Sequence, residues 1–350
     1  MSINLNVSNS LQPLSHVLAQ ELKDTAQDPF VKQWIVTQTE GMNSWLKQTI
    51  AKQNGIAANL HFCKPNDIIS EIYRKIIRSG KSIVNSEDIR WCIYSLLNHP
   101  DFLNTYPNIS NYYLGNDIKR IALSDELADL FDQYQIYRHD IVETWNEKLM
   151  NGEAPETWQM WLWINVKIKL GTAYEDRVQM ANSLIASLID PAVQESVKRN
   201  IPSLHLFGLA VITPYYLRIF HALAQFIDIH LYLVNPCPEH IWMDYNSEQQ
   251  ITKLLKKRNK QRKEVDHLLV GNDLLLNWGT IIKESFKLLM DHDDFVNVYN
   301  DDFAMPIENP STLLKKIQYD IYNNSNKEQR LVLANTCLLY TSPSPRDAHE

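Results

Sequence analysis

Apolar positions at the start of the chain follow two different periods, one typical of buried strands and one typical of amphipathic helices. Short apolar runs at residues 4–7 and 32–37 predict strands. Apolar residues spaced three or four apart over residues 11–22 predict a helix between those strands. The chain therefore opens with the βα unit of an α/β fold.

A long stretch of helical spacing separates this unit from the next strand patterns. From residue 65 to about residue 198 the spacing is helical throughout. Strand patterns return at residues 203–209 and 227–234, on either side of a helix predicted over residues 214–225, so a right-handed crossover between parallel strands is expected. Helices in the long stretch are expected at residues 67–77, 86–97, 118–134, 141–150, 157–170 and 177–189.

These patterns divide the chain into an α/β domain and an all-helical insertion. Residues 1–64 form the first part of the α/β domain, residues 65–200 the inserted helical subdomain and residues 201–330 the remainder of the α/β domain. The most informative observation would be the order of the strands that end near Thr37, Leu209 and Val234, because adjacent parallel strands would place Gln38 and Gly208 at carboxyl ends where open α/β sheets bind ligands. Further helices are expected near residues 249–263, 272–290 and 312–322.

The last part of the chain has a different composition. Residues 331–340 resemble a strand with no following helix, and residues 341–347 have the composition of turns. We expect the chain to be truncated here. The tail of residues 331–350 then includes about a dozen terminal residues of foreign sequence.

Composition predicts a globular, cytoplasmic protein. The chain has 350 residues, of which 45% are hydrophobic and 21% charged, enough to bury a sizeable core. Residues 1–9 lack the basic and apolar order of a signal peptide, and the longest apolar run, residues 204–212, is too short to span a membrane. The four cysteines form no CxxC pair, which favours reduced thiols: Cys63, Cys92, Cys237 and Cys337.

Charge restricts how the chain can meet nucleic acid. A net charge of -7 argues against coating a phosphate backbone, so any contact must be focal. Residues 253–263 contain seven basic residues in eleven on a predicted helix. This run either holds duplex phosphates or forms an exposed charged face, and the pattern does not distinguish the two.

The chain lacks the residues that bind nucleotide at two places where an α/β sheet holds them. The turn at residues 38–45, between a predicted strand and helix, has one glycine and no lysine, and its Glu40 would repel a phosphate. The later predicted strand, residues 203–209, ends with Gly208 and Leu209, where an ATPase motor carries an acidic pair for Mg²⁺. ATP hydrolysis by the usual mechanism is therefore excluded. The plainer alternative is a pair of core strands with no nucleotide-binding ancestor.

Other candidate sites have simple explanations. Cys237 and His240 have metal-ligand spacing but no second pair. Residues 291–294, Asp-His-Asp-Asp, suit a surface turn better than a nuclease site. The helically spaced Trp158, Trp161 and Trp163 are expected to pack in a core. We expect no metal or cofactor in this chain.

Five sequence blocks carry a resemblance to a known family. These blocks resemble the amino-terminal region of the RecC family, the gamma chain of exodeoxyribonuclease V: residues 38–45, 55–62, 129–138, 235–237 with Trp242, and 277–279. The likeness spans roughly residues 1–330 and covers only the first part of family members. It implies a degenerate superfamily 1 helicase-like parallel sheet, with P-loop NTPase-like topology but no nucleotide motifs, and a large helical insertion.

The resemblance also implies a function and partners. It implies a non-catalytic DNA-binding and scaffolding subunit that joins RecB-like and RecD-like chains in a heterotrimeric helicase and nuclease. Such a complex acts on broken DNA ends during repair by recombination. This subunit would guide the 3′-ended single strand and inspect it for the hotspot Chi. ATP and Mg²⁺ would bind the partner subunits, and the complex would associate with the bacterial nucleoid during repair.

The resemblance assigns hotspot-reading positions. By this resemblance, the chain retains six of the family's hotspot-reading residues: Gln38, Asp129, Leu130, Asp132, Arg138 and Arg177. The chain departs from the family pattern at four other positions, where Glu40, Ser44, Lys64 and Ser70 replace Thr, Gln, Leu and Trp. Loss of the aromatic residue at position 70 removes a stacking surface, and Glu40 changes the local charge. DNA binding is therefore a firmer expectation than recognition of the usual Chi sequence.

The helix over residues 118–134 gives these positions a physical rationale. Asp129, Asp132 and Gln133 share one face at i, i+3 and i+4, opposite the apolar Leu127 and Phe131. A carboxylate can accept a hydrogen bond from the cytosine amino group, and Gln can pair with adenine. The simpler alternative is a solvated helix face. For Arg138, a contact with phosphate or guanine and a salt bridge to Asp132 or Asp140 both remain open.

A second group lies at a strand end. Gln38 ends a strand at the edge where open α/β sheets bind ligands, and Thr39, Asn43 and Ser44 add hydrogen-bonding groups beside a helix amino terminus. Two rival functions also stay open: an active, DNA-stimulated ATPase with an atypical phosphate site, and an interaction platform that never touches DNA.

Overall fold

The computed structural model describes residues 3–25, 30–76, 80–238, 240–247, 249–253, 269–290, 298–305, 307 and 312–325. Its centre is a six-stranded sheet in which every paired neighbour is parallel. The strand order is β3-β2-β6-β7-β1-β8. The strands are β1 (Ile3–Ser8), β2 (Gln33–Val36), β3 (Leu60–Cys63), β6 (Ser203–Phe207), β7 (Asp228–Val234) and β8 (Val298–Asn300).

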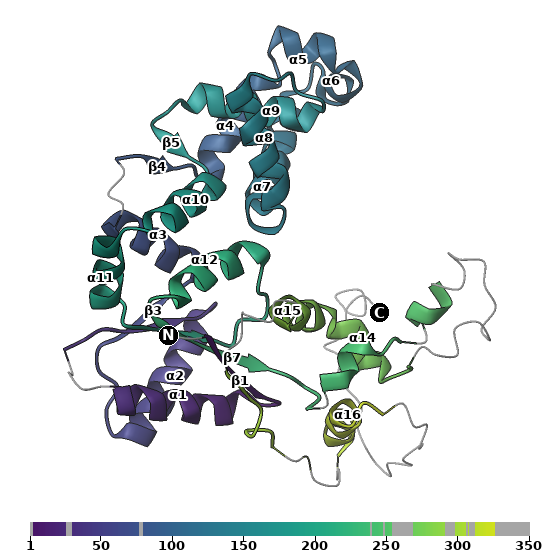
Figure 1. Cartoon of the computed structure of the whole chain (residues 1–350). Coiled ribbons are helices and arrows are strands. Elements are labelled where there is room, and N and C mark those ends of the chain that lie inside the picture. The colour runs from purple at the N-terminus through teal and green to yellow at the C-terminus, as the bar shows by residue number, and fades with distance from the viewer. Residues whose placement is uncertain are drawn as a thin grey trace, which may run out of the picture.

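Helices cover both faces of this sheet, as Figure 1 shows. On one face, α1 (Leu11–Thr25) and α2 (Glu40–Asn54) pack on Ile35, Phe207 and Tyr232. Buried apolar residues on both faces explain why these strands read as near-continuous apolar runs.

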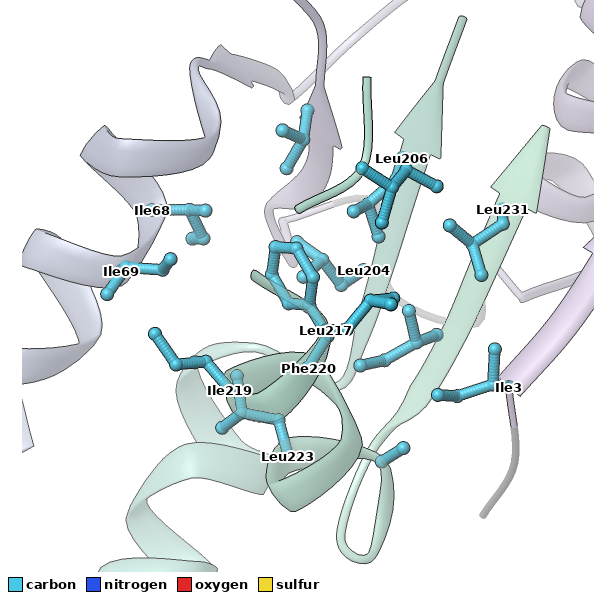
Figure 2. Close-up of a cluster of buried hydrophobic side chains, with 14 of the residues drawn as sticks. Ile3, Ile68, Ile69, Leu204, Leu206, Leu217, Ile219, Phe220, Leu223 and Leu231 are labelled. Carbon is cyan, nitrogen blue, oxygen red and sulfur yellow. The ribbon is translucent and has the colours of Figure 1, made fainter. Parts of the chain in front are cut away.

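The opposite face carries the larger core. Here α3 (Pro65–Ile76), α12 (Pro214–Ala224) and α15 (Thr280–Met290) pack on strand side chains such as Leu204 and Leu206. Figure 2 shows Ile68, Ile69, Leu217, Ile219, Phe220 and Leu223 gathered over these strands.

The helical insertion projects from the sheet and has a core of its own (Figure 1). Phe131 and Trp163 lie at its centre, with ring centroids 5.5 Å apart. The helices around this core are α4 (Ser86–Leu96), α5 (Pro100–Thr105), α6 (Pro107–Tyr113), α7 (Asp117–Tyr137), α8 (His139–Asn151) and α9 (Trp158–Leu170). The two helices that follow, α10 (Arg177–Ser187) and α11 (Pro191–Asn200), pack mainly in the core on the sheet.

The periodicity predicted an insertion that is helical throughout, but the insertion also contains two short strands. Two strands, β4 (Ser82–Ile83) and β5 (Tyr174–Glu175), pair in parallel where the chain enters and leaves the α4–α9 helices. A strand of two residues is too short to produce a repeating pattern, so periodicity could not find it. The same reason applies to β8, which is also short and was also not predicted. The sequence patterns did not predict β3, α5, α6 and α11 either.

Most of the remaining predicted elements are confirmed near their predicted bounds. The single helix predicted over residues 272–290 is wrong, because the chain forms α14 (Asp273–Trp278) and α15, separated at Gly279. The helix predicted over residues 312–322 is α16 (Leu313–Tyr322). Residues 249–253 are helical, whereas residues 254–263 and the tail 331–350 lie outside the described residues.

The fold class is α/β with a mostly parallel sheet, as predicted. The two strands predicted on either side of residues 214–225 are parallel neighbours, β6 and β7, as predicted, and β2 lies next to β6 in the same sheet. No helix within the described residues is long and apolar enough to cross a membrane.

Candidate nucleic-acid interface

The carboxyl edge of the sheet gathers several of the predicted site residues. The connection after β2 runs through α2 on one face, and the connection after β6 runs through α12 on the other. Neighbouring parallel strands whose connections leave on opposite faces form a topological switch point, where open α/β sheets bind ligands. Gln38 follows β2 at this point and is exposed.

Lys64 lies beside Gln38 at the same edge. It follows β3, which pairs with β2, and the backbone N–H of Thr37 donates to the carbonyl of Cys63 at 3.0 Å. Lys64 is exposed and supplies a positive charge where Glu40 supplies a negative one. This edge therefore presents the amide of Gln38 and the carboxylate of Glu40 in the β2–α2 turn, with the ammonium of Lys64 after the neighbouring strand β3.

The polar groups of the β2–α2 turn are largely engaged with one another. The hydroxyl of Thr39 caps α2 by accepting from the N–H of Met42, and the buried Asn43 donates to Glu40 Oε2 at 3.1 Å. Asn43 Oδ1 also accepts a hydrogen bond from the hydroxyl of Thr37. The amino terminus of α2, which would attract a phosphate, therefore holds the protein's own Glu40 carboxylate in its first turn.

A second switch point lies between β1 and β7, and the sequence reasoning missed it. The connection after β1 runs through α1, whereas α15, which follows β7, packs on the opposite face. Ser8 Oγ donates to the carbonyl of Phe303, and Asn9 exchanges two hydrogen bonds with the backbone of Met305, all at 2.8 Å. The protein's own chain therefore binds this strand end.

A signal for this second site was available in the sequence. Ser8, Asn9 and Ser10 directly follow the first strand and precede the first helix, which is the position of a phosphate-binding loop. These residues include neither a glycine nor a lysine. Both strand–helix turns on the α1–α2 side therefore lack the groups that hold a nucleotide phosphate.

The polar face predicted on α7 is present. Leu127 and Phe131 are buried in the helical core, whereas Asp129 and Gln133 are exposed. Leu130, which the resemblance placed among the DNA-reading residues, is half-buried and packs against the core. Asp129 lines a surface pocket with Ser86, Glu87, Arg90 and Asp125.

Asp132 and Arg177 are paired with each other. Arg177 Nε donates to Asp132 Oδ1 at 3.1 Å, and its backbone N–H donates to the buried Gln135 Oε1 at 2.9 Å. The side chains of Asp132 and Arg177 are mostly buried. Two predicted DNA contacts from distant parts of the sequence thus meet in one ion pair between α7 and α10.

Arg138 takes one of the two salt bridges left open by the sequence. Its Nε and Nη2 atoms donate to the two carboxylate oxygens of Asp140, each at 3.2 Å. These hydrogen bonds lower the pKa of Asp140 below its ordinary value. Both side chains are exposed, so a ligand can still reach the guanidinium.

Tyrosines of α12 connect the sheet edge with the insertion. Tyr216 donates to Asn66 Oδ1 of α3 at 2.8 Å, and Tyr215 donates to the carbonyl of Arg177 at 3.5 Å. Burial raises the pKa of Tyr216 to about 12, so this hydroxyl remains a donor. Asn66 lies two residues after Lys64. Hydrogen bonds through the two tyrosines therefore connect the end of β3 with the start of α10.

The remaining predicted residues lie outside these hydrogen-bonded connections. Ser44 is exposed on α2, and Ser70 is half-buried on α3. Trp163 is buried and Trp158 and Trp161 pack against the same core, so their predicted packing role is confirmed. The basic run beyond Lys253 and residues 291–294 lie outside the described residues.

The fold and this edge define a class of protein: an α/β protein with an open parallel sheet, a helical insertion and strand–helix turns that lack phosphate-binding residues. The chain belongs to the RecC family, because residues 3–324 match the family model described as RecC, N-terminal domain. The RecC resemblance in the sequence is therefore confirmed.

Relatives from three bacteria support this assignment. The chain is 29% identical to the RecBCD enzyme subunit RecC of Escherichia coli over 343 residues, covering 87% of this chain and 29% of the relative. It is 26% identical to the subunit of the same name from Haemophilus influenzae, covering 91% and 33%, and 26% identical to that from Mycolicibacterium smegmatis, covering 94% and 29%. The chain spans about a third of the length of the curated relatives it matches.

Proposed function

We propose that this chain is the amino-terminal part of a non-catalytic subunit that binds DNA and forms a scaffold within a RecBCD-type helicase and nuclease. Its relatives are each named as a RecBCD enzyme subunit, which supports assembly with RecB-like and RecD-like chains. ATP and Mg²⁺ belong to those partner chains in this proposal. The complex would act in the cytoplasm, in repair of double-strand breaks by homologous recombination.

One observation carries the non-catalytic part of this proposal. The sheet has switch points at β2–β6 and β1–β7, yet the protein's own groups bind Asn43 at the first and Ser8 and Asn9 at the second. Glu40 stands in the first turn of α2, and residues 303 and 305 bind the end of β1. A degenerate helicase-like sheet, which retains a motor's strand arrangement without its phosphate and Mg²⁺ ligands, accounts for this combination.

The DNA-binding part rests on exposed groups along the sheet edge and α7. Gln38, Lys64, Asp129 and Gln133 are exposed and offer hydrogen bonds suited to base edges, with one cation for phosphate. A single strand displays its base edges, so this surface suits single-stranded DNA, such as the 3′-ended strand of this proposal, better than a duplex. In this proposal the residues guide that strand and inspect it for a Chi-type sequence, with Arg138 available to phosphate or guanine.

Photo-crosslinking in the complete complex tests the DNA contact. A photoreactive phenylalanine analogue replaces Gln38 or Gln133, and a matched control replaces Ile189, which is 80% exposed elsewhere in the insertion. We expect crosslinks to single-stranded DNA from positions 38 and 133 and none from position 189. Absence of crosslinks from both test positions would favour the interaction platform over the DNA guide.

A hydrolysis assay tests the non-catalytic assignment separately. The full chain, purified without partner subunits, is incubated with ATP and single-stranded DNA. We expect no DNA-stimulated ATP hydrolysis. Hydrolysis that Glu40→Ala or Gly41→Ala abolishes would instead identify the chain as an ATPase with an atypical phosphate site.

A further inference from the structure

Two histidines stand side by side on the sheet face that α1 covers. His205 of β6 and His230 of β7 are register partners, so their side chains leave the sheet on the same face. Their rings are stacked, with centroids 4.9 Å apart and planes inclined by 19°. Two imidazoles held this closely by the backbone form a fixed pair of nitrogen ligands.

Glu21 of α1 completes this group from above the sheet. Its Oε2 atom lies 3.1 Å from His230 Nδ1 and 3.9 Å from His205 Nδ1. One ligand atom from each of the three residues lies within 4.8 Å of the others. This spacing allows one ion to bind all three after small side-chain adjustments.

We propose that Glu21, His205 and His230 form a binding site for a divalent transition-metal ion, with Zn²⁺ as the best match. Two imidazoles and one carboxylate are a common ligand set for Zn²⁺ and related ions, whereas Mg²⁺ and Ca²⁺ prefer oxygen ligands alone. The ion would join the helix that follows β1 to the central strands β6 and β7. This role is independent of the DNA-binding surface, because it lies on the α1 face of the sheet.

The surroundings of the histidines suit metal binding. His205 is fully buried, so water does not compete with an ion for its ring nitrogens. Its Nε2 atom lies 3.4 Å from the hydroxyl of Ser203, an outer contact that orients the ring. The buried Nδ1 atom of His230 faces the Glu21 carboxylate at 3.1 Å.

An ion also has a route into the site. The His205 side chain is 0% exposed, but those of His230 and Glu21 are 13% and 28% exposed. The carboxylate and the second imidazole therefore border solvent, while the first imidazole closes the site from within. The hydroxyl of Tyr232, 3.0 Å from His205 Nδ1 and hydrogen-bonded to Glu21, is a further oxygen in contact with the group.

The alternative is a hydrogen-bonded network that needs no ion. In that reading Tyr232 donates to Glu21, and His205 donates to Tyr232. The two readings differ in one measurable respect, since only a metal site binds Zn²⁺ in defined proportion to the chain. Visible absorption by bound Co²⁺ adds a spectroscopic signature that a hydrogen-bonded network does not produce.

The test uses the full chain after removal of metals with EDTA. We expect Zn²⁺ to bind at about one ion per chain and to raise the Tm, because an ion that binds only the folded state stabilises it. Co²⁺ should give the visible absorption bands of a low-symmetry site. Glu21→Gln and His230→Gln should each abolish the bands and the Tm increase, whereas His16→Gln, on the exposed side of the same helix, should retain both.

Two results would overturn the proposal. The unmodified chain failing to bind Zn²⁺ at micromolar concentration would favour the hydrogen-bonded network, and it requires no variant to fold. Zn²⁺ binding that is equal in the unmodified chain, Glu21→Gln and His230→Gln would place the ion elsewhere. Chemical unfolding of each variant without metal shows whether it is folded when the metal is added.

Discussion

Arg177 donates a hydrogen bond from Nε to Asp132 Oδ1 at 3.1 Å and thereby joins the first residue of α10 to the middle of α7. The RecC resemblance assigned each of these residues to DNA separately. Because they are partners, a nucleotide that engages either one must compete with this ion pair or bind beside it. The pair therefore has a structural role that can be measured without DNA.

A double-mutant cycle on Asp132→Ala and Arg177→Ala should measure this role. Both side chains are mostly buried, so we expect a coupling energy of about 1 kcal/mol in urea unfolding. The Arg138–Asp140 pair is the matched control, since its side chains are 56% and 61% exposed and solvent should make its coupling energy clearly smaller. Equal coupling in the two pairs would contradict this difference in burial.

The buried ion pair between Lys167 and Asp176, at the start of α10, should contribute more to the free energy of unfolding than the Asp132–Arg177 pair. Lys167 Nζ lies 2.8 Å from Asp176 Oδ2 and 2.6 Å from Gln179 Oε1, and Asp176 also caps α10. Lys167→Met would leave the Asp176 carboxylate buried without its cation, at a cost of about 3 kcal/mol in the free energy of unfolding. Lys198→Met removes a surface pair with Glu195 and should cost less than about 0.5 kcal/mol. Similar losses in the two variants would argue against this account.

Glu175 of β5 should make the stability of the insertion depend on pH. Burial alone would raise the pKa of Glu175, but hydrogen bonds from Lys81 and Tyr73 outweigh it and hold the pKa below the ordinary value. A carboxyl whose pKa is lower in the folded state stabilises the fold above its unfolded pKa, and this stability is lost as pH falls through the folded pKa.

Urea unfolding from pH 7 down to pH 3 checks this dependence. The unmodified chain should lose more stability over that range than Glu175→Gln, which has no carboxyl to protonate. Glu195→Gln, at an exposed surface pair, serves as the control and should follow the unmodified chain. Parallel curves for the unmodified chain and Glu175→Gln would show that Glu175 makes no such contribution.

Local sequence was enough to predict the long elements but not the contacts between them. The spacing of Leu127 and Phe131 indicates both the helix and its buried side, because helical periodicity is a local property. The partner of Asp132 lies 45 residues further along the chain, and only the packing of α7 on α10 brings it close. The two-residue strands β4 and β5 were missed because two residues cannot repeat a pattern whose period is two.

The sites show the same limit. The missing phosphate-binding residues at positions 38–45 are visible in the sequence, whereas the second strand end, at Ser8 and Asn9, becomes meaningful only when β1 is seen beside β7. His205 and His230 occupy the third position of their strands, but their stacking depends on the register of β6 and β7. The position of Glu21 above them depends on how α1 crosses the sheet.

Cys63 should react slowly with iodoacetamide in the folded chain. Burial raises the pKa of this thiol to about 12, and the carboxylates of Asp67 and Glu71 add to the effect, so little thiolate exists at pH 8. Peptide mass spectrometry should find slow labelling of Cys63 in buffer and fast labelling in urea. Asp67→Asn should accelerate labelling only slightly, since burial is the main cause. Fast labelling of the folded chain would show that the thiol is not shielded as described.

Lys64 offers the most direct test of the sheet edge as a DNA surface. Lys64 is exposed where β3 ends, so Lys64→Leu removes one cation from the edge without disturbing a buried group. Each phosphate contact on single-stranded DNA contributes about 0.7 to the slope of log K against log salt concentration. In the complete complex, Lys64→Leu should weaken binding of single-stranded DNA and make that slope shallower by about 0.7. Lys198→Leu removes a cation from α11, away from the edge, and should leave affinity and slope unchanged. If Lys64→Leu changes neither quantity, the strand does not pass the β3 end of the sheet, and the exposed face of α7 would have to account for DNA contact alone.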